Sequence, residues 1–174
     1  EYIHRLWVRG IGLIFLIPFL IFVIRKQIDW FLIKRLLLVV ALAGLTASAG
    51  WIMVQSGLVD RPWVNAYKLT LHFMLAVVTI GAMVKAIADV YLLENKPLKG
   101  HTGFVKVLLV FTFFQLVFAG FMAGMHAGLS YPTWPSMNGS FIPAVLRDGS
   151  NWTWENMTKY DSFSFAPALV QFIH

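Results

Sequence analysis

The sequence contains no cysteine, and few of its residues carry a charge. The absence of cysteine excludes disulfides, iron–sulfur clusters held by this chain and thiolate ligation of haem iron. Charged residues make up 13% of the 174 positions, about half of their usual share in a soluble domain. Hydrophobic residues make up 59% instead. This composition is typical of an integral membrane protein.

Four long apolar segments cover 6–24, 36–54, 67–93 and 104–125, and a fifth begins near Phe165. Each of the four is close to or above the ~20 residues that a helix needs to cross a bilayer. We therefore predict an all-α integral membrane protein with four transmembrane helices and the start of a fifth. Lys85 and Asp89 are four residues apart near the end of the third segment, and we expect them to form an ion pair.

The net charge of +6 follows the loops between these segments, which favours a membrane topology over nucleic-acid binding. Positive side chains dominate the loops at 25–35 and 94–103, namely Arg25, Lys26, Lys34, Arg35, Lys96 and Lys99. The positive-inside rule places these two loops in the cytoplasm, or in the matrix of an organelle. The loop at 55–66 and the long connection at 126–164 then face outward.

Three histidines share one depth in this topology. His4, His72 and His174 belong to three separate segments, and each lies within about two turns of the outer end of its helix. Neutral imidazoles inside a helical bundle are suitable axial ligands for haem iron. The shared depth therefore favours a haem site over three separate packing residues. His126 lies at a similar depth, and we interpret it as a polar contact at the pocket mouth rather than an iron ligand.

Further charged groups lie on the predicted outer side. Glu1 is one helical turn from His4, where it can move protons or stabilise positive charge on a reacting carbon, or serve only as a solvated acid at a helix start. Arg5, Arg9, Arg61 and Lys68 can bind haem propionates or extend toward the interface. The tryptophan-rich connection at 126–164 is either a cap over an outer pocket or an interfacial surface loop. Gly120 and Gly124 indicate close helix packing.

Several segments together resemble the haem A synthase family, in its mitochondrial and proteobacterial branch. They are Glu1-Tyr-Ile-His4-Arg5-Leu with Arg9-Gly-Ile-Gly12, then Gly50-Trp-Ile-Met-Val-Gln-Ser-Gly57, Tyr67-Lys-Leu-Thr-Leu-His72, Ala119-Gly-Phe-Met-Ala-Gly124 with Ala127-Gly-Leu-Ser-Tyr-Pro-Thr-Trp-Pro-Ser-Met-Asn-Gly139, and Val170-Gln-Phe-Ile-His174. They occur in the family's order, from its second membrane helix to the start of its sixth. The cysteine pair found in an outer loop of some bacterial members is missing.

The resemblance implies an eight-helix protein of two similar four-helix halves that oxidises a ring methyl of haem O to the formyl group of haem A. Residues 1–93 would then belong to the substrate half, 94–103 to a linker and 104–174 to the half that holds haem b. His4, His72, Arg5 and Arg9 would bind the substrate haem, and Glu1 would be the catalytic carboxylate. His174 would be one axial ligand of haem b.

The resemblance also carries expectations about the chain as a whole. The family's first helix and its last helices would lie outside these 174 residues, so we expect the chain alone to be inactive. Haem O synthase, an electron donor and a second copy of the chain are partners consistent with this activity. The expected location is a bacterial or mitochondrial inner membrane, with the histidines toward the periplasm or the intermembrane space.

Two other functions fit parts of the sequence. A bis-histidine cytochrome b that only transfers electrons would need the same histidines, but it would not need Glu1 or a long outer loop. A transporter is disfavoured because polar residues at mid-membrane depth are sparse.

Overall fold

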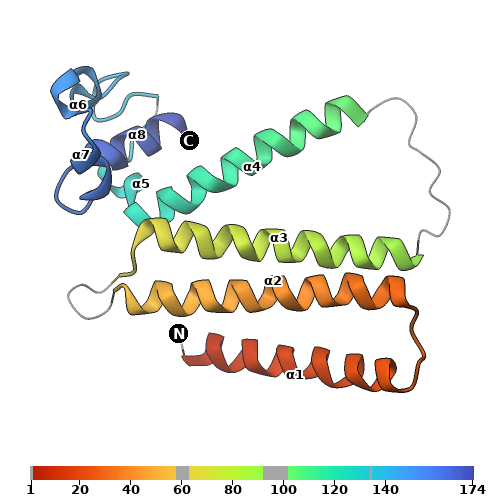
Figure 1. Cartoon of the computed structure of the whole chain (residues 1–174). Helices are drawn as coiled ribbons and strands as arrows, with labels where there is room; N and C mark the ends of the chain where they lie inside the picture. Colours follow the sequence, from red (N-terminus) through yellow and green to blue (C-terminus); the bar gives the residue numbers. More distant parts are fainter. Residues whose placement is uncertain (1, 58–62, 92–101, 134) are drawn as a thin grey trace. The chain divides into compact units, whose positions relative to one another are not determined.

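The computed structural model describes residues 2–57, 63–91, 102–133 and 135–174. Helices joined by turns and loops make up these residues, and no strand is formed among them. The long helices are α1 (Tyr2–Ile24), α2 (Trp30–Gln55), α3 (Ala66–Tyr91) and α4 (Thr102–Met125). The short ones are α5 (Ala127–Ser130), α6 (Ala144–Arg147), the 3₁₀ turn η1 (Gly149–Asn151), α7 (Trp154–Thr158) and α8 (Phe165–Ile173). Figure 1 shows this order along the chain.

The four long helices confirm the predicted membrane segments. Each has 23 to 26 residues and is apolar enough to cross a bilayer. At a rise of 1.5 Å per residue, they are about 35–39 Å long, which exceeds the ~30 Å hydrocarbon core. Most of their apolar side chains are exposed in the isolated chain, as expected for surfaces that meet lipid or other helices. The fifth segment also begins as a helix at Phe165.

The chain divides into two compact units. The first unit comprises Glu1–Ala41 and Ile80–Glu94, and the second comprises Leu42–Thr79 and Asn95–His174. The helices α2 and α3 each contribute one part to each unit.

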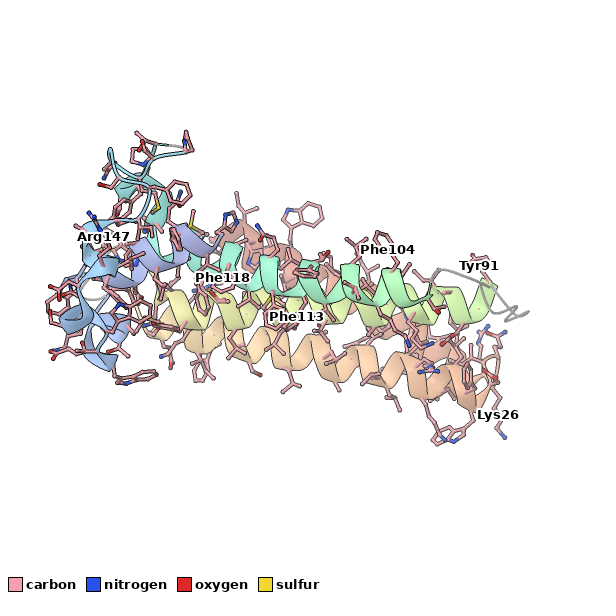
Figure 2. All side chains as sticks on the ribbon, turned by 90° about the horizontal axis from the view of Figure 1, so that it is seen from above. Lys26, Tyr91, Phe104, Phe113, Phe118 and Arg147 are labelled. Atoms are coloured by element: carbon pink, nitrogen blue, oxygen red, sulfur yellow. The ribbon has the colours of Figure 1, made fainter. Side chains whose placement is uncertain are left out.

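In the first unit, the positive loop is shorter than the sequence predicts. The side chain of Asp29 accepts a hydrogen bond from the amide of Leu32 at 3.0 Å, and this cap starts α2 at Trp30. Lys34 and Arg35 consequently lie inside the first turns of α2 rather than in a loop. Their charges remain at the same end of the unit as Lys26, which Figure 2 shows together with Tyr91.

Asp89 links two helices of the first unit. Its carboxylate lies 3.2 Å from Nζ of Lys85, which confirms the predicted ion pair within α3. The other carboxylate oxygen lies 3.1 Å from Nε of Arg35 on α2. Because the side chain of Asp89 is only 16% exposed, its charge is shared between two cations at a partly buried position. The sequence predicts the first of these contacts but not the second.

In the second unit, small side chains bring α3 and α4 close together. A Cβ atom added at Gly120 would lie 2.9 Å from Oγ1 of Thr70, and one at Gly124 would lie 2.6 Å from Cα of Ala66. Only glycine leaves room for such an approach, so the predicted packing role of this pair is confirmed. On the other side of α3, the hydroxyl oxygens of Thr46 and Thr79 lie 3.1 Å apart and join it to α2.

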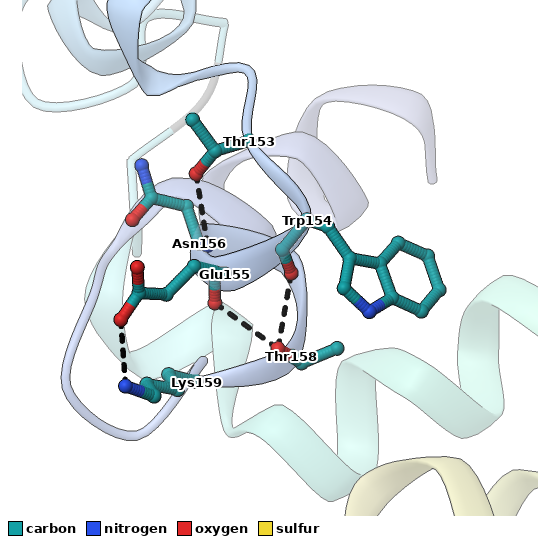
Figure 3. Close-up of polar contacts among 6 residues, drawn as sticks. All are labelled: Thr153, Trp154, Glu155, Asn156, Thr158 and Lys159. Atoms are coloured by element: carbon teal, nitrogen blue, oxygen red, sulfur yellow. Dashed lines mark hydrogen bonds and ion pairs between the residues drawn. The ribbon is translucent and has the colours of Figure 1, made fainter.

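The 126–164 connection is a folded subdomain that packs around α8. Figure 1 shows α5, α6 and α7 gathered beside α8 at one end of α4, and Figure 2 places Arg147 there, at the far end of α4 from Phe104. Figure 3 shows how α7 is held: Thr153 caps its start, Thr158 bonds to carbonyls of the preceding turn, and Lys159 pairs with Glu155.

Two tyrosines attach this subdomain to the beginning of α3. The hydroxyl of Tyr160 accepts a hydrogen bond from the buried amide of Ala66 at 2.8 Å, and the hydroxyl of Tyr67 donates one to the carbonyl of Met157. An apolar cluster surrounds these bonds, formed by Ala66, Met125, Ala127, Tyr160, Ala166 and Val170. The connection is thus anchored to the ends of α3 and α4 rather than lying loosely at the surface.

Candidate functional site

His72 is held by α2 through both a hydrogen bond and a close contact. Its Nδ1 lies 2.9 Å from the carbonyl oxygen of Thr46. Because a carbonyl can only accept, a neutral imidazole in this contact carries its proton on Nδ1. Nε2 then keeps its lone pair, which is the state that an iron ligand requires.

The imidazole of His72 packs directly against Gly50 of α2. A Cβ atom at position 50 would lie 2.8 Å from Cε1 and 3.0 Å from Nδ1 of the ring. Any other residue would therefore push the ring away from α2. The glycine and the carbonyl of Thr46 together fix the position of the ring and its tautomer.

His174 lies beside a hollow of about 430 Å³ in the second unit. Its other walls are Ala119, Met122, Ala123, His126, Gly128 and Leu129. Three of these residues are alanine or glycine, which leaves room for a flat apolar ligand next to an imidazole. His126 and His174 are the two side chains of the lining that can form strong hydrogen bonds or bind a metal.

One turn before His174, Gln171 has a buried oxygen that lacks a hydrogen-bond partner among the residues the structure describes. This Oε1 atom lies 4.0 Å from the place that a Cβ of Gly128 would occupy, and Gly128 lines the same hollow. A buried amide oxygen without a partner is costly and calls for a donor. A histidine that binds a metal usually donates its other N–H to such an oxygen. The residues around His174 are therefore suited to a histidine that binds haem iron.

A second hollow of about 500 Å³ is lined by His126, Trp63 and Asp161, among other residues. The indole nitrogen of Trp63 donates a hydrogen bond to the carboxylate of Asp161 at 3.1 Å. The rings of Trp63 and His126 meet edge to face, with centroids 5.5 Å apart. His126 thus stands between two hollows.

The remaining site residues from the sequence belong to other parts of the chain. His4, Arg5 and Arg9 are exposed on the first turns of α1, in the first unit. His72 and His174 belong to the second unit, so a joint site of His4 and His72 stays a prediction. Glu1 and Arg61 lie outside the described residues, as does most of the expected 94–103 linker. Lys68 is half-buried in the first turn of α3.

The described residues contain no cluster of three histidine, aspartate or glutamate side chains that could hold a metal ion. Haem iron does not need one, because the porphyrin supplies four ligands and the protein only the axial positions.

The titratable groups of the 126–164 subdomain have ordinary structural partners. The hydrogen bond and the positive charge of Lys159 lower the pKa of Glu155. The hydroxyl of Ser150, with a smaller contribution from its amide, lowers the pKa of Asp148. Both carboxylates are exposed and remain charged at neutral pH, so neither has the raised pKa of a general acid.

The residues that surround the imidazoles could not be recognised from the sequence. Gly50 and Thr46 look like ordinary small residues of a membrane helix, and Gln171 looks like one polar residue in an apolar segment. Their spacing in the sequence carries no signal of their contacts with His72 or with the hollow. A glycine 22 residues before a candidate histidine becomes informative only once the two helices are paired.

Comparisons with known proteins place the chain in a family. The model of a family described as "Cytochrome oxidase assembly protein" (COX15-CtaA) matches residues 1–174. A haem A synthase of Nitrosospira multiformis is 40% identical over 179 aligned positions, which cover all of this chain and 48% of that protein. One from Wolbachia sp. subsp. Brugia malayi is 40% identical over all of this chain and 51% of its own length.

A third relative, the haem A synthase of Parvibaculum lavamentivorans, is 40% identical over 84% of this chain and 43% of its own length. The chain thus spans about half the length of the curated relatives it matches. No solved structure matches it. Because the family model covers every residue and agrees with the four membrane-length helices, the chain belongs to the COX15-CtaA family of cytochrome oxidase assembly proteins.

Proposed function

We propose that this chain forms part of a haem A synthase, an enzyme that oxidises a ring methyl of haem O to the formyl group of haem A. The observation that carries the proposal is the state of His72, whose Nδ1 contacts a carbonyl and whose Nε2 is left as a ligand. The relatives that match the chain over its whole length bear this name.

The substrate haem is bound by His72 together with His4. Nε2 of His72 would serve as a ligand of the haem iron and so hold the substrate at this side chain. Arg5 and Arg9 are one turn apart on α1 and provide cations for the propionates. Glu1, one turn before His4, accepts a proton or stabilises the positive charge that develops on the methyl carbon during oxidation.

A second haem, haem b, is held in the other half of the protein by His174. When bound, it supplies one-electron redox chemistry. This chain contributes the imidazole and the small-residue wall of Ala119, Ala123 and Gly128. Gln171, three residues before His174, contributes a buried amide oxygen near Gly128 that is available to a donor. Because the chain spans about half the length of its relatives, we propose that it would be inactive alone.

The protein is embedded in a bacterial or mitochondrial inner membrane, with the histidine ends of its helices toward the periplasm or the intermembrane space. The cationic end of the first unit supports this orientation, since Lys26, Lys34 and Arg35 gather there. Haem O synthase, an electron donor and a second copy of the protein are its proposed partners.

The decisive experiment changes Glu1 to Gln in the full-length protein, which keeps the size of the side chain but removes its charge. Haem is then extracted from the membranes and separated into B, O and A types. We expect the variant to retain bound haem but to form no haem A. Glu155→Gln is the matched control, because that carboxylate is exposed on α7, and it should leave the haem A yield unchanged.

A normal yield of haem A from Glu1→Gln would remove the catalytic role of this carboxylate. A full-length wild-type protein that binds and reduces haem without ever forming haem A would instead be a bis-histidine cytochrome b. That alternative shares the histidines of this chain but has no use for Glu1.

A further inference from the structure

The hollow beside His174 has an apolar wall and one other imidazole at its edge. The wall is formed by Ala119, Met122, Ala123, Gly128 and Leu129, while His126 is the only lining side chain besides His174 that can donate a strong hydrogen bond. A ligand that binds to His174 and fills this hollow therefore places its body against carbon atoms. Any polar group that it carries toward the edge meets His126.

The backbone holds His126 in an unusual conformation. Its φ of 52° and ψ of 32° are left-handed, at the junction where α4 ends and α5 begins. Left-handed backbone at a residue other than glycine is strained, and it persists where the surroundings impose it. Here the following turn imposes it, because the amide of Leu129 donates to the carbonyl of His126 at 3.0 Å.

Trp63 limits where the imidazole of His126 can go. The edge-to-face contact at 5.5 Å fixes one side of the ring, and the indole itself is tied to Asp161. The imidazole is thus supported from the side of the larger hollow while it remains exposed toward the hollow of His174. A donor held at the edge of an apolar cavity is suited to an acceptor on the rim of the ligand.

Haem combines the two features that this hollow would recognise: a flat apolar macrocycle and anionic propionates on one edge. We propose that His126 donates a hydrogen bond to a propionate of the haem that is bound through His174. This assignment rests on the proposed function, because it assumes haem at His174. It gives His126 a role in haem retention and orientation, with no part in the oxidation of the substrate.

The propionate itself provides the test. The full-length protein is prepared without haem in a His72→Ala background, which removes one of the two proposed ligands of the substrate haem, and is titrated with protohaem IX or with its dimethyl ester. The ester keeps the macrocycle and the iron but has no carboxylate. Binding is followed by the absorbance of the histidine-ligated haem. Loss of this signal in a further His174→Ala variant identifies the site.

We choose His126→Gly as the test variant because glycine adopts the left-handed conformation without strain. It should bind protohaem about tenfold or more weakly than the parent, as expected for a lost charge-assisted hydrogen bond, and bind the ester equally well. His126→Arg again places an N–H donor at this position and should restore most of the difference. Ser130→Ala is the matched control, since Ser130 lines only the larger hollow, and it should bind both porphyrins like the parent.

Two results would overturn the proposal while leaving the proposed function intact. One is equal binding of protohaem by His126→Gly and the parent. The other is an equal loss of acid and ester, which would mean that the imidazole acts through packing. If the parent binds neither porphyrin through His174, the assignment of haem to this hollow fails, and the role of His126 fails with it.

Discussion

Gly50→Ala is the substitution that tests the geometry of His72 most directly. The new methyl group would lie 2.8 Å from Cε1 and 3.0 Å from Nδ1 of the imidazole, whereas ordinary contacts begin near 3.4 Å. The ring must move away from α2, and its 2.9 Å hydrogen bond to Thr46 is then lengthened or lost. We expect weaker binding of haem O, because the tautomer and the direction of Nε2 are no longer fixed.

The cost of Gly50→Ala follows from three contributions. Overpacking costs about 1–3 kcal/mol. The lost hydrogen bond costs about 0.5–1.5 kcal/mol. The change from glycine to alanine in a helix returns up to about 1 kcal/mol. Together they lower the free energy of unfolding by roughly 2 kcal/mol, to be measured in detergent by circular dichroism.

Gly44→Ala on the same helix is the control, because no heavy atom lies within 4 Å of its added methyl group. It should leave stability unchanged or raise it by up to about 1 kcal/mol. If the two variants behave alike in stability and in haem O binding, the ring of His72 does not rest on Gly50 in the protein, and the reasoning about its tautomer fails.

Three further predictions concern a buried hydrogen bond, a close helix contact and an ion pair of the second unit. Tyr160→Phe leaves the buried amide of Ala66 without its acceptor, so we expect a loss of about 1–3 kcal/mol and faster hydrogen exchange at that amide. Gly124→Ala forces the α3 and α4 backbones apart and should destabilise the protein by about 1–3 kcal/mol, while Gly103→Ala on the same helix should not; equal effects would exclude the close approach. The ion pair with Lys159 lowers the pKa of Glu155 in the folded state, so it stabilises α7 fully above the unfolded pKa of 4.5. This contribution is lost as the pH falls through the lowered pKa. Titration of the carboxylate by NMR should therefore show a midpoint below 4.5, and Lys159→Met should move that midpoint upward.

The membrane helices could be predicted from the sequence because each is a long apolar segment bounded by polar residues. Hydropathy alone carries that signal. The start of α2 could not be placed as well, since it depends on the single cap of Asp29 rather than on the apolar pattern. The link from Asp89 to Arg35 was missed for a related reason: the two residues are 54 positions apart and meet only when α2 and α3 are paired.

The same distinction applies to the candidate site, where some residues could be identified from the sequence and others could not. His72 and His174 were identified from the sequence because histidine is rare in membrane segments and three of them share one depth. The groups that prepare them were invisible there, because a backbone carbonyl, a glycine and a glutamine acquire their roles from a neighbouring helix. The family resemblance suggested these histidines as ligands, but it did not indicate the carbonyl that selects the tautomer of His72.

The position of His126 shows how the two kinds of information combine. Its depth in the sequence-based topology suggested only a polar contact at the mouth of a pocket rather than an iron ligand. In the structure His126 has a left-handed backbone, its ring contacts Trp63, and it lines the same hollow as His174. These contacts define the surroundings of the imidazole, which its depth alone does not. If His174 binds the iron as proposed, an imidazole that lines the same hollow at a separate position is suited to bind a propionate at the edge of the porphyrin. The comparison of acid and ester separates these two roles, because only the second depends on a carboxylate.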